Sequence, residues 1–217
     1  MKYLLFVLSL IFSCAVAMGQ EGHHDARMGQ FKEMRAVDST DIVLLGNALV
    51  EYGGDWNILL RYHHIRNRGI AGDDASHLML ALPSILKGKP KAIVLMVGGE
   101  DIVKGRSVDY AFERSVEVMH AIRARSPKTL LLVQSNLPVH AYSNKDLSKK
   151  IHMMAALNIR LRHYCERKHI VYLNLFRDFV RRGTNEMRKE LSQDGYLLTP
   201  FGYKLWAFEL RKYLVNL

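Results

Sequence analysis

The residues of this chain that could do chemistry are, first, four carboxylates in segments that connect apolar runs. Glu100 and Asp101 follow the apolar run Ala92–Val97, while Asp73 and Asp194 lie in glycine-containing segments. Two carboxyl groups at a suitable separation can hydrolyse a glycoside, one as acid and the other as base or nucleophile. Glycoside chemistry is therefore one hypothesis if these carboxylates face a common cleft.

Two groups of histidines raise the question of a metal. His63 and His64 adjoin a predicted strand, and neighbouring strand residues point to opposite faces, so a shared ion is disfavoured. His23 and His24 precede Asp25 in a segment that we expect to be a mobile tail. Because no zinc-like ligand spacing occurs in the chain, we expect no metal and no other cofactor.

A third feature is the turn Gly46-Asn47-Ala48, which follows the apolar run Ile42–Leu45 and opens a predicted helix. Such a strand-to-helix turn exposes one side chain and directs backbone N–H groups toward a ligand. A serine at its third position could attack an acyl carbonyl, whereas Ala48 has no nucleophilic group. The simpler interpretation is that Gly46 and Asn47 form an ordinary turn between strand and helix.

Several short segments, taken in order, resemble the conserved blocks of the SGNH (GDSL-type) esterases. They are Asp41–Leu49, Gly53–Trp56, Asn67–Asp73, Val97–Ile102, Leu137–His140 and Asp194–Pro200. The resemblance spans most of residues 41–217 and implies a three-layer, flavodoxin-like α/β sandwich. It also implies an oxyanion site in which the backbone N–H of Gly72 takes part.

This resemblance fails at the residues that would react. Ala48 stands at the position of the nucleophilic serine, Leu197 at that of the general-base histidine, and Glu100 at that of the oxyanion-binding asparagine. Asp194 is retained at the position of the acid. An ionised carboxylate only accepts hydrogen bonds, so Glu100 would repel an oxyanion. Losing one member of a catalytic triad lowers turnover by roughly 10⁴–10⁶, and the sequence therefore indicates a catalytically degenerate esterase.

Asn47, Trp56 and Tyr196 are candidate residues of the cleft rim, together with Tyr52 and Tyr142. Aromatic faces beside polar groups suit sugar rings and acyl chains. For Trp56 the alternative is that the indole packs beneath the first loop.

The elements that must position these residues alternate between apolar strand-like runs and amphipathic helical patterns. This order predicts a parallel sheet of about five strands with helices on both faces. The predicted strands are Ile42–Leu45, a short one near His64–Asn67, Ala92–Val97, Thr129–Gln134 and Ile170–Leu175. The predicted helices are Val50–Tyr62, Ala75–Leu86, Val108–Arg125, Leu147–Lys168 and Phe201–Leu214.

The N-terminus has the features of a cleaved export signal. Lys2 precedes the apolar run Tyr3–Ala17, which is short for a membrane span of ~20 residues. We expect a signal peptide at residues 1–19, an N-terminal segment at 20–40 and one domain at 41–217. The protein would then be exported, to a periplasm or the medium, without a stable membrane span. Attachment of a lipid to Cys14 is the alternative that we do not favour.

The formal net charge of +10 raises the question of polyanionic partners. Basic runs at Arg160–His163 and Arg177–Arg182 could bind nucleic acid, but on amphipathic helices they are better explained as solvated faces. We therefore expect no nucleic-acid partner; for an exported protein, anionic glycans or lipid phosphates are more economical. Cys165 is the remaining cysteine after cleavage, which leaves no partner for a disulfide, and we expect it to be packed.

Together these features favour an exported SGNH-like protein that has lost esterase chemistry and keeps a ligand cleft. The family's substrates imply an acylated carbohydrate or another ester-like small molecule as ligand. One alternative is an active hydrolase in which Glu100 is the base that activates water, and another is a protein-binding scaffold with a closed cleft. An open pocket around Ala48, Gly72 and Glu100 would favour ligand binding, while a cleft filled by Tyr196 and Leu197 would favour the scaffold.

Overall fold

The computed structural model describes residues 22–141 and 147–215. The predicted signal peptide, including Cys14, and the predicted rim residue Tyr142 lie outside these ranges. The strands are β1 (Ile42–Gly46), β2 (Ile65–Gly69), β3 (Ala92–Leu95), β4 (Leu130–Gln134) and β5 (Val171–Leu173). The helices are α2 (Ala48–Glu51), α3 (Trp56–Leu60), α4 (Ala75–Leu86), α5 (Gly99–Val103), α6 (Val108–Arg125), α7 (Ser148–Lys168), α8 (Phe176–Phe179), a 3-10 turn η2 (Lys189–Leu191) and α9 (Pro200–Leu214).

The five strands form one parallel sheet in the order β2-β1-β3-β4-β5. This is the strand order of flavodoxin-like folds, so the predicted fold class is confirmed. β1 lies between β2 and β3, with Ile42 opposite both Ile65 and Ala92. The carboxyl ends of β1 and β3 are therefore neighbours, and the segments that follow them meet at one edge of the sheet.

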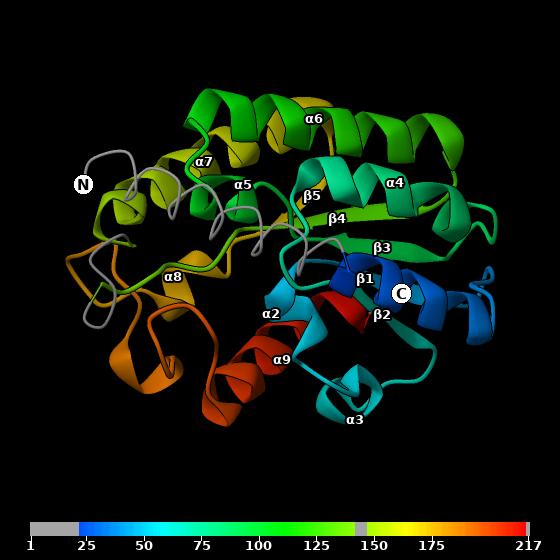
Figure 1. Ribbon diagram of the computed structural model, residues 1–217, viewed down its shortest axis with the longest axis horizontal. Coiled ribbons are helices and arrows are strands. Elements are labelled where there is room, and N and C mark those ends of the chain that lie inside the picture. The colour runs from blue at the N-terminus through cyan, green and yellow to red at the C-terminus, as the bar shows by residue number, and fades with distance from the viewer. Residues whose placement is uncertain (1–21, 142–146, 216–217) are drawn as a thin grey trace, which may run out of the picture.

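Helices cover both faces of the sheet, as Figure 1 shows. On one face α4, α6 and α7 pack against alternate strand residues such as Val43 and Ile93. On the other face α2, α3 and α9 pack against the intervening residues, such as Leu44 and Val94. Strands buried on both sides explain the uninterrupted apolar runs in the sequence.

The predicted helix Val50–Tyr62 is wrong, because the chain forms two short helices, α2 and α3, in its place. Between them Gly54 has a left-handed φ of 67°, a conformation that glycine adopts without steric penalty. A Cβ on Gly53 would lie 2.4 Å from the ring of Trp56. Asp55 then caps α3 by accepting a hydrogen bond from the backbone N–H of Asn57.

The N-terminal segment is not the tail that we expected. Residues 22–33 form a helix, and His24 from this helix is only 8% exposed. Its Nδ1 atom lies 2.9 Å from the Oδ1 atom of Asp73, whose side chain is buried. On the next turn, Arg27 forms an ion pair with Glu51 at 3.1 Å. The expectation failed because the contacts that hold this helix come from residues far along the chain.

Two further points concern membranes and thiols. Within the described part of the chain, no helix combines the length and the apolar character that crossing a bilayer requires. Cys165 is buried in α7, and burial raises the pKa of its thiol to about 12. The packed position predicted for Cys165 is confirmed.

Candidate functional site

The turn after β1 places Asn47 and Ala48 at the carboxyl edge of the sheet. Asn47 is the N-cap of α2, where its side chain accepts a hydrogen bond from the backbone N–H of Leu49. Ala48 is the first residue of the helix and is 6% exposed. A Cβ on Gly46 would approach Val50 to 2.8 Å and the backbone of Met96 to 3.1 Å, so the turn needs glycine there.

Glu100 enters the same region from the segment after β3. Gly98, with a left-handed φ of 86°, begins α5, and Glu100 lies in its first turn. Burial raises the pKa of Glu100, although hydrogen bonds from Tyr196 and Asn47 act against this rise. Both of these hydrogen bonds are accepted by the Oε2 atom of Glu100.

Three side chains from distant segments form a hydrogen-bonded group, which we call the Asn47–Tyr196–Glu100 cluster. The hydroxyl of Tyr196 donates to Oε2 of Glu100 at 2.8 Å and accepts from Nδ2 of Asn47 at 2.7 Å. The amide of Asn47 also lies 3.3 Å from the same carboxylate oxygen. Burial and the nearby carboxylate raise the pKa of the Tyr196 hydroxyl well above its usual value, so this hydroxyl keeps its proton and donates a hydrogen bond to Glu100.

The segment Asp194–Leu197 forms a turn that Asp194 itself holds together. Oδ1 of Asp194 accepts hydrogen bonds from the backbone N–H groups of Tyr196 at 2.8 Å and Leu197 at 2.7 Å. These contacts give Asp194 a local role in holding the turn. The turn directs Tyr196 toward Glu100, while Leu197, also half-buried, lines a separate pocket.

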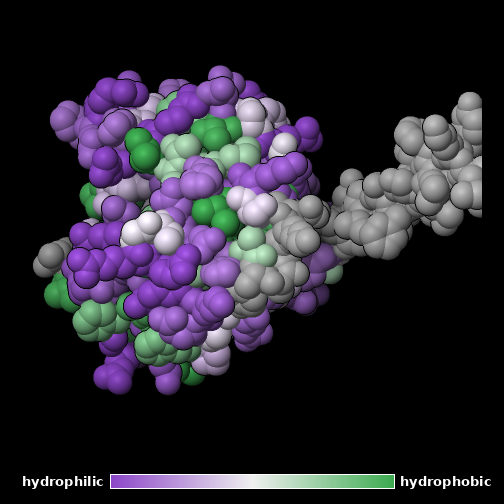
Figure 2. Space-filling view, turned by 90° about the vertical axis from the view of Figure 1, so that its left-hand side faces the viewer, coloured by the Kyte–Doolittle hydropathy of each residue, from purple (hydrophilic) through white to green (hydrophobic). Residues whose placement is uncertain are grey.

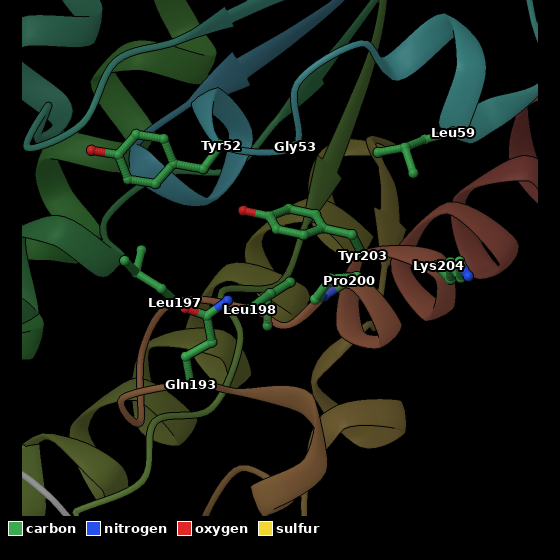
Figure 3. A pocket seen from close by; sticks show the side chains of 9 residues that line it. All are labelled: Tyr52, Gly53, Leu59, Gln193, Leu197, Leu198, Pro200, Tyr203 and Lys204. Carbon is green, nitrogen blue, oxygen red and sulfur yellow. The ribbon is translucent and has the colours of Figure 1, made fainter.

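That pocket, of about 480 Å³, opens between the end of α2 and the start of α9. In Figure 3 the side chain of Leu197 and the rings of Tyr52 and Tyr203 approach the same space from three segments. Tyr52 is 52% exposed, whereas the hydroxyl of Tyr203 donates to the backbone oxygen of Leu49 at 3.0 Å. The complete lining is Tyr52, Gly53, Leu59, Gln193, Leu197, Leu198, Pro200, Tyr203 and Lys204. We call this cavity the tyrosine pocket.

Gly72, the predicted oxyanion donor, lies in the loop after β2 with a φ of 81°. A hydrogen bond of 3.1 Å from the N–H of Ile70 to the oxygen of Gly46 holds the start of this loop beside the end of β1. Glu51 of α2 accepts a hydrogen bond of 2.6 Å from the N–H of Ala71. Glu51 also contacts the N-terminal helix through His23 at 3.0 Å, so that helix covers this loop.

The four carboxylates named from the sequence have different partners. Asp73 contacts His24, and burial raises its pKa. Asp101 accepts from the N–H of Ala75 at 3.1 Å, and burial raises its pKa to about 6. Asp194 and Glu100 have the contacts given above. Among the residues that the structure describes, no group of histidine, cysteine or acidic side chains is arranged to hold a metal ion.

Trp56 does not lie on the rim, so that prediction is wrong and the packing interpretation is correct. Its side chain is 1% exposed, and its Nε1 atom donates to the oxygen of Val50 at 2.9 Å. The ring packs edge-on against Trp206 with centroids 4.9 Å apart. Trp56 therefore supports the α2–α3 loop from below, through contacts with α9 that the sequence alone did not indicate.

The carboxyl end of the sheet faces left in Figure 1, where α5 and α8 follow their strands. Figure 2 shows this end directly, with a small group of apolar residues within a largely hydrophilic surface. The position of the candidate site agrees with the rule that open α/β sheets bind ligands beyond the carboxyl ends of their strands.

The fold and the order of the site segments define an SGNH-type α/β hydrolase architecture. The GDSL-like Lipase/Acylhydrolase family matches residues 44–205. The chain belongs to this family.

Solved structures with the same fold support this placement. A protein from Streptococcus pneumonia that carries the name platelet activating factor superposes with a TM-score of 0.84 at 21% identity, covering 94% of this chain and 99% of its own. A GDSL-like lipase from Bacteroides thetaiotaomicron superposes with a TM-score of 0.78 at 16% identity, covering 89% of this chain and 97% of its own. An acetyl xylan esterase superposes with a TM-score of 0.68 at 15% identity, covering 80% of this chain and 99% of its own. A comparison with curated proteins found no match.

Proposed function

We propose that this chain is an exported, catalytically inactive relative of the acyl-ester hydrolases that binds an ester-like ligand. The observation that carries the proposal is the Asn47–Tyr196–Glu100 cluster beside Ala48. Where the family resemblance places a nucleophile and an oxyanion donor, this chain has a methyl group and a carboxylate bonded to a tyrosine. Export rests on the signal-like residues 1–19.

The chemistry of the cluster opposes acyl transfer. Ala48 has no group that could attack a carbonyl, and Leu197 has none that could accept a proton. A carboxylate at position 100 places negative charge where an oxyanion would develop, and losing one oxyanion donor alone typically lowers turnover by ~10²–10³. Because the Tyr196 hydroxyl already donates to Glu100, it is not free to take the place of the missing donor.

The binding part of the proposal rests on the tyrosine pocket, which lies beside the cluster and is not the pocket around Ala48, Gly72 and Glu100 that the sequence led us to look for. Its lining combines two tyrosine rings, the aliphatic side chains of Leu59 and Leu197, and the ammonium group of Lys204. A volume of about 480 Å³ is in the range of small-molecule sites. Aromatic and aliphatic walls suit a sugar ring that carries an acyl group, and an acylated carbohydrate fits the name of the acetyl xylan esterase among the structural neighbours.

The test is hydrolysis of a short p-nitrophenyl ester by the chain from residue 20 onward, beside a buffer blank. We expect the wild-type protein to match the blank. The triple variant Ala48→Ser, Glu100→Asn, Leu197→His should hydrolyse the ester if the scaffold is otherwise intact, and Ala48→Ser alone is the matched control without a base. Adding Tyr196→Ala to the triple variant tests whether the tyrosine ring occupies space that the ester needs. Turnover by wild type that persists through further purification would refute the proposed inactivity.

Ligand binding is tested separately with acetylated xylo-oligosaccharides and calorimetry. We expect Tyr52→Ala to weaken binding, because this half-exposed ring forms one wall of the tyrosine pocket. Binding that is unchanged by Tyr52→Ala would contradict the assignment of this pocket. No binding of any acylated sugar or ester would leave the protein-binding scaffold as the better interpretation.

One observation favours the second candidate, an active hydrolase with Glu100 as base. Burial raises the pKa of Glu100, and a base works best when its pKa lies near the working pH. In that case wild-type turnover should rise with pH through the pKa of Glu100, and Glu100→Gln should abolish it. A flat pH profile at the level of the blank would exclude this candidate.

A further inference from the structure

The opposite edge of the sheet, where the strands begin, gathers basic residues from separate loops. Arg61, His63 and His64 precede β2, Lys89 and Lys91 precede β3, and Arg125 and Lys128 precede β4. Because all strands are parallel, these loops lie along one edge, on the right of Figure 1. We call this group the basic edge.

Backbone hydrogen bonds fix these loops side by side. The N–H of Ile42 donates to the oxygen of His64 at 2.9 Å, and the N–H of Lys91 donates to the oxygen of Asp41 at 2.9 Å. The oxygen of Lys91 in turn accepts from the N–H of Leu130 at 3.1 Å. Neighbouring strands lie about 4.8 Å apart, so the loops before β2, β1, β3 and β4 form a row of roughly 14 Å.

Two adjoining pockets follow this row. The first, of about 680 Å³, is lined by Ser39, Thr40, Arg61, Tyr62, His63, His64 and Lys91. The second, of about 500 Å³, is lined by Ser39, Lys89, Pro90, Lys91, Arg125, Ser126, Pro127 and Lys128. They share Ser39 and Lys91, so together they form one elongated depression. Among the described residues, its lining contains five lysine and arginine residues and no carboxylate.

Two acidic residues beside the first pocket, Asp38 and Asp41, pair mainly with arginines outside the two linings, although Nδ1 of His64 lies 3.9 Å from Asp41. Asp41 is buried and forms ion pairs with Arg35 at 2.5 Å and Arg66 at 3.0 Å, and Asp38 also pairs with Arg35. Among the described residues, none of the lysines and arginines of the two linings forms an ion pair with a carboxylate.

The basic runs that were visible in the sequence behave differently. Arg160 pairs with Asp109 and lies over the ring of Phe112. Arg181 forms an ion pair of 2.7 Å with Glu186. The charge at these runs is therefore partly compensated, whereas the charge at the basic edge is not.

The backbone at the basic edge gives independent support. In the described part of the chain, the non-glycine residues with positive φ are Arg61, His64, Lys89 and His169, with values of 48°, 62°, 48° and 52°. All four precede strands at this edge. A left-handed conformation costs a non-glycine residue roughly 1–2 kcal/mol, and glycine is the usual residue there. Arg61 and His169 are the C-caps of α3 and α7, where a left-handed residue is common. His64 and Lys89 are not assigned as helix caps, and they keep basic or imidazole side chains where glycine would be less strained.

Stabilisation of helix ends is the competing explanation, because helix C-termini carry partial negative charge that basic residues complement. It accounts for Arg125 in the last turn of α6 and for Arg61, the C-cap of α3. It does not account for Lys91, which directly precedes β3, or for Lys128, which lies beyond the end of α6. The dipole effect falls off within the last turn.

We propose that the basic edge binds an anionic polysaccharide along the depression from Arg61 to Lys128. A row of cations of this length fits a chain with repeating sulfate or carboxylate groups rather than a single anion. The linings contain no leucine, isoleucine, valine, phenylalanine, methionine or tryptophan, which does not suit insertion into a membrane. The rings of Tyr62, His63 and His64 lie at one end of the depression, and the second pocket is lined by no aromatic residue of the described chain, so a platform for stacking successive bases does not extend along the row.

The test measures binding of a fluorescent heparin octasaccharide at low and at physiological salt. The variant Lys89→Gln, Lys91→Gln, Lys128→Gln removes three charges from the basic edge. The matched control, Lys149→Gln, Arg177→Gln, Arg182→Gln, removes the same charge from the start of α7 and the region of α8. We expect the first variant to lose about tenfold in affinity, a value in line with measured surface charge interactions, and the control to lose less than about twofold.

A second variant separates binding from stability. Lys89→Gly relieves the left-handed conformation at residue 89, so its melting temperature should rise while its affinity for heparin falls. If Lys89 served only to stabilise the fold, melting temperature would fall and affinity would stay unchanged. Equal losses in the two triple variants, no binding by the wild type, or tighter binding of polyphosphate or oligo-dT of equal charge would each overturn the proposal.

Discussion

Replacing Tyr196 by phenylalanine removes one oxygen atom from the Asn47–Tyr196–Glu100 cluster and leaves the aromatic ring. The lost hydroxyl donates to Glu100 at 2.8 Å and accepts from Asn47 at 2.7 Å. In Tyr196→Phe, the carboxylate keeps only the longer contact of 3.3 Å with the Asn47 amide. The variant therefore tests whether the hydroxyl stabilises the charge of Glu100.

The size of the effect depends on pH. A hydrogen bond to a charged group contributes about 1.5–3 kcal/mol, and one between neutral groups contributes about 1 kcal/mol. Burial raises the pKa of Glu100 above its usual range. Glu100 therefore stabilises the fold most below the pKa of an unfolded glutamate, about 4.3, and this contribution is lost as pH rises through its folded pKa. The Tyr196 hydroxyl reduces that loss of stability, because it donates a hydrogen bond to the charged carboxylate. Tyr196→Phe should therefore lower the free energy of unfolding by about 1 kcal/mol at pH 4 and by about 2–3 kcal/mol at pH 8.

Urea and thermal unfolding at the two pH values measure this difference. For a chain of this size, 1 kcal/mol corresponds to about 2–4 °C in melting temperature, so a loss of about 2–3 kcal/mol should make the variant melt about 4–12 °C below wild type at pH 8. Glu100→Gln is the control background, in which Tyr196→Phe should have the same effect at both pH values. Two results would refute the reasoning. One is a loss of stability from Tyr196→Phe that is the same at pH 4 and pH 8 in the wild-type background. The other is a loss at pH 8 that is as large in the Glu100→Gln background as in the wild-type background.

The remaining predictions concern other contacts. Burial raises the pKa of Asp101 to about 6, so its carboxyl stabilises the fold below pH ~4, and up to ~3 kcal/mol of the free energy of unfolding is lost as pH rises through 6. In urea unfolding at a series of pH values, Asp101→Asn should flatten this part of the dependence of stability on pH. A dependence identical to that of wild type would contradict the prediction. His24→Ala should cost about 3 kcal/mol, because a buried partner is left unpaired, and should open residues 22–33 to limited proteolysis. The control is His23→Ala, which should lower the free energy of unfolding by less than about 1 kcal/mol. Equal losses of stability in the two variants would count against a specific role of His24. Trp56→Ala should cost about 3–5 kcal/mol by chemical denaturation, since the buried indole packs on α9, and a loss below about 1 kcal/mol would argue against that packing.

The sheet was predictable from the sequence because its strands are buried on both faces. Apolar runs such as Ile42–Leu45 mark these strands, and the long helices α4 and α6 have the predicted bounds. The short helices α5 and α8 escaped prediction because one turn is too short to show a period. The helix at residues 22–33 also escaped, since Gly29 weakens its local preference and its anchor, Asp73, lies far along the chain.

Within the candidate site, the sequence predicted which segments meet but not how their side chains pair. The positions of Asn47 and Glu100 follow from strand order, because β1 and β3 are neighbours. The hydrogen bond between Asn47 and Tyr196 joins residues 149 positions apart, and no local pattern encodes it. The basic edge was missed for the same reason, since its charges come singly or in pairs from separate loops.

The side chains of the Asn47–Tyr196–Glu100 cluster depend on one another. A carboxylate buried at position 100 would be strongly unfavourable without donors, and the Tyr196 hydroxyl and the Asn47 amide supply them. If position 100 carried an asparagine, the Tyr196 hydroxyl would have to donate to a neutral amide oxygen, and the Asn47 amide would face an amide in place of a charge.

This dependence bears on how activity could return. Catalytic groups that act as a unit contribute little singly, so Ala48→Ser or Leu197→His alone should leave hydrolysis at the level of the blank. Glu100→Asn alone should cost stability, because it removes the charged acceptor of Tyr196. A path back to catalysis through single substitutions would thus lose stability before it gained turnover. If the proposed loss of catalysis is correct, the hydrogen bonds of the cluster stabilise the form of the site that lacks the reactive groups.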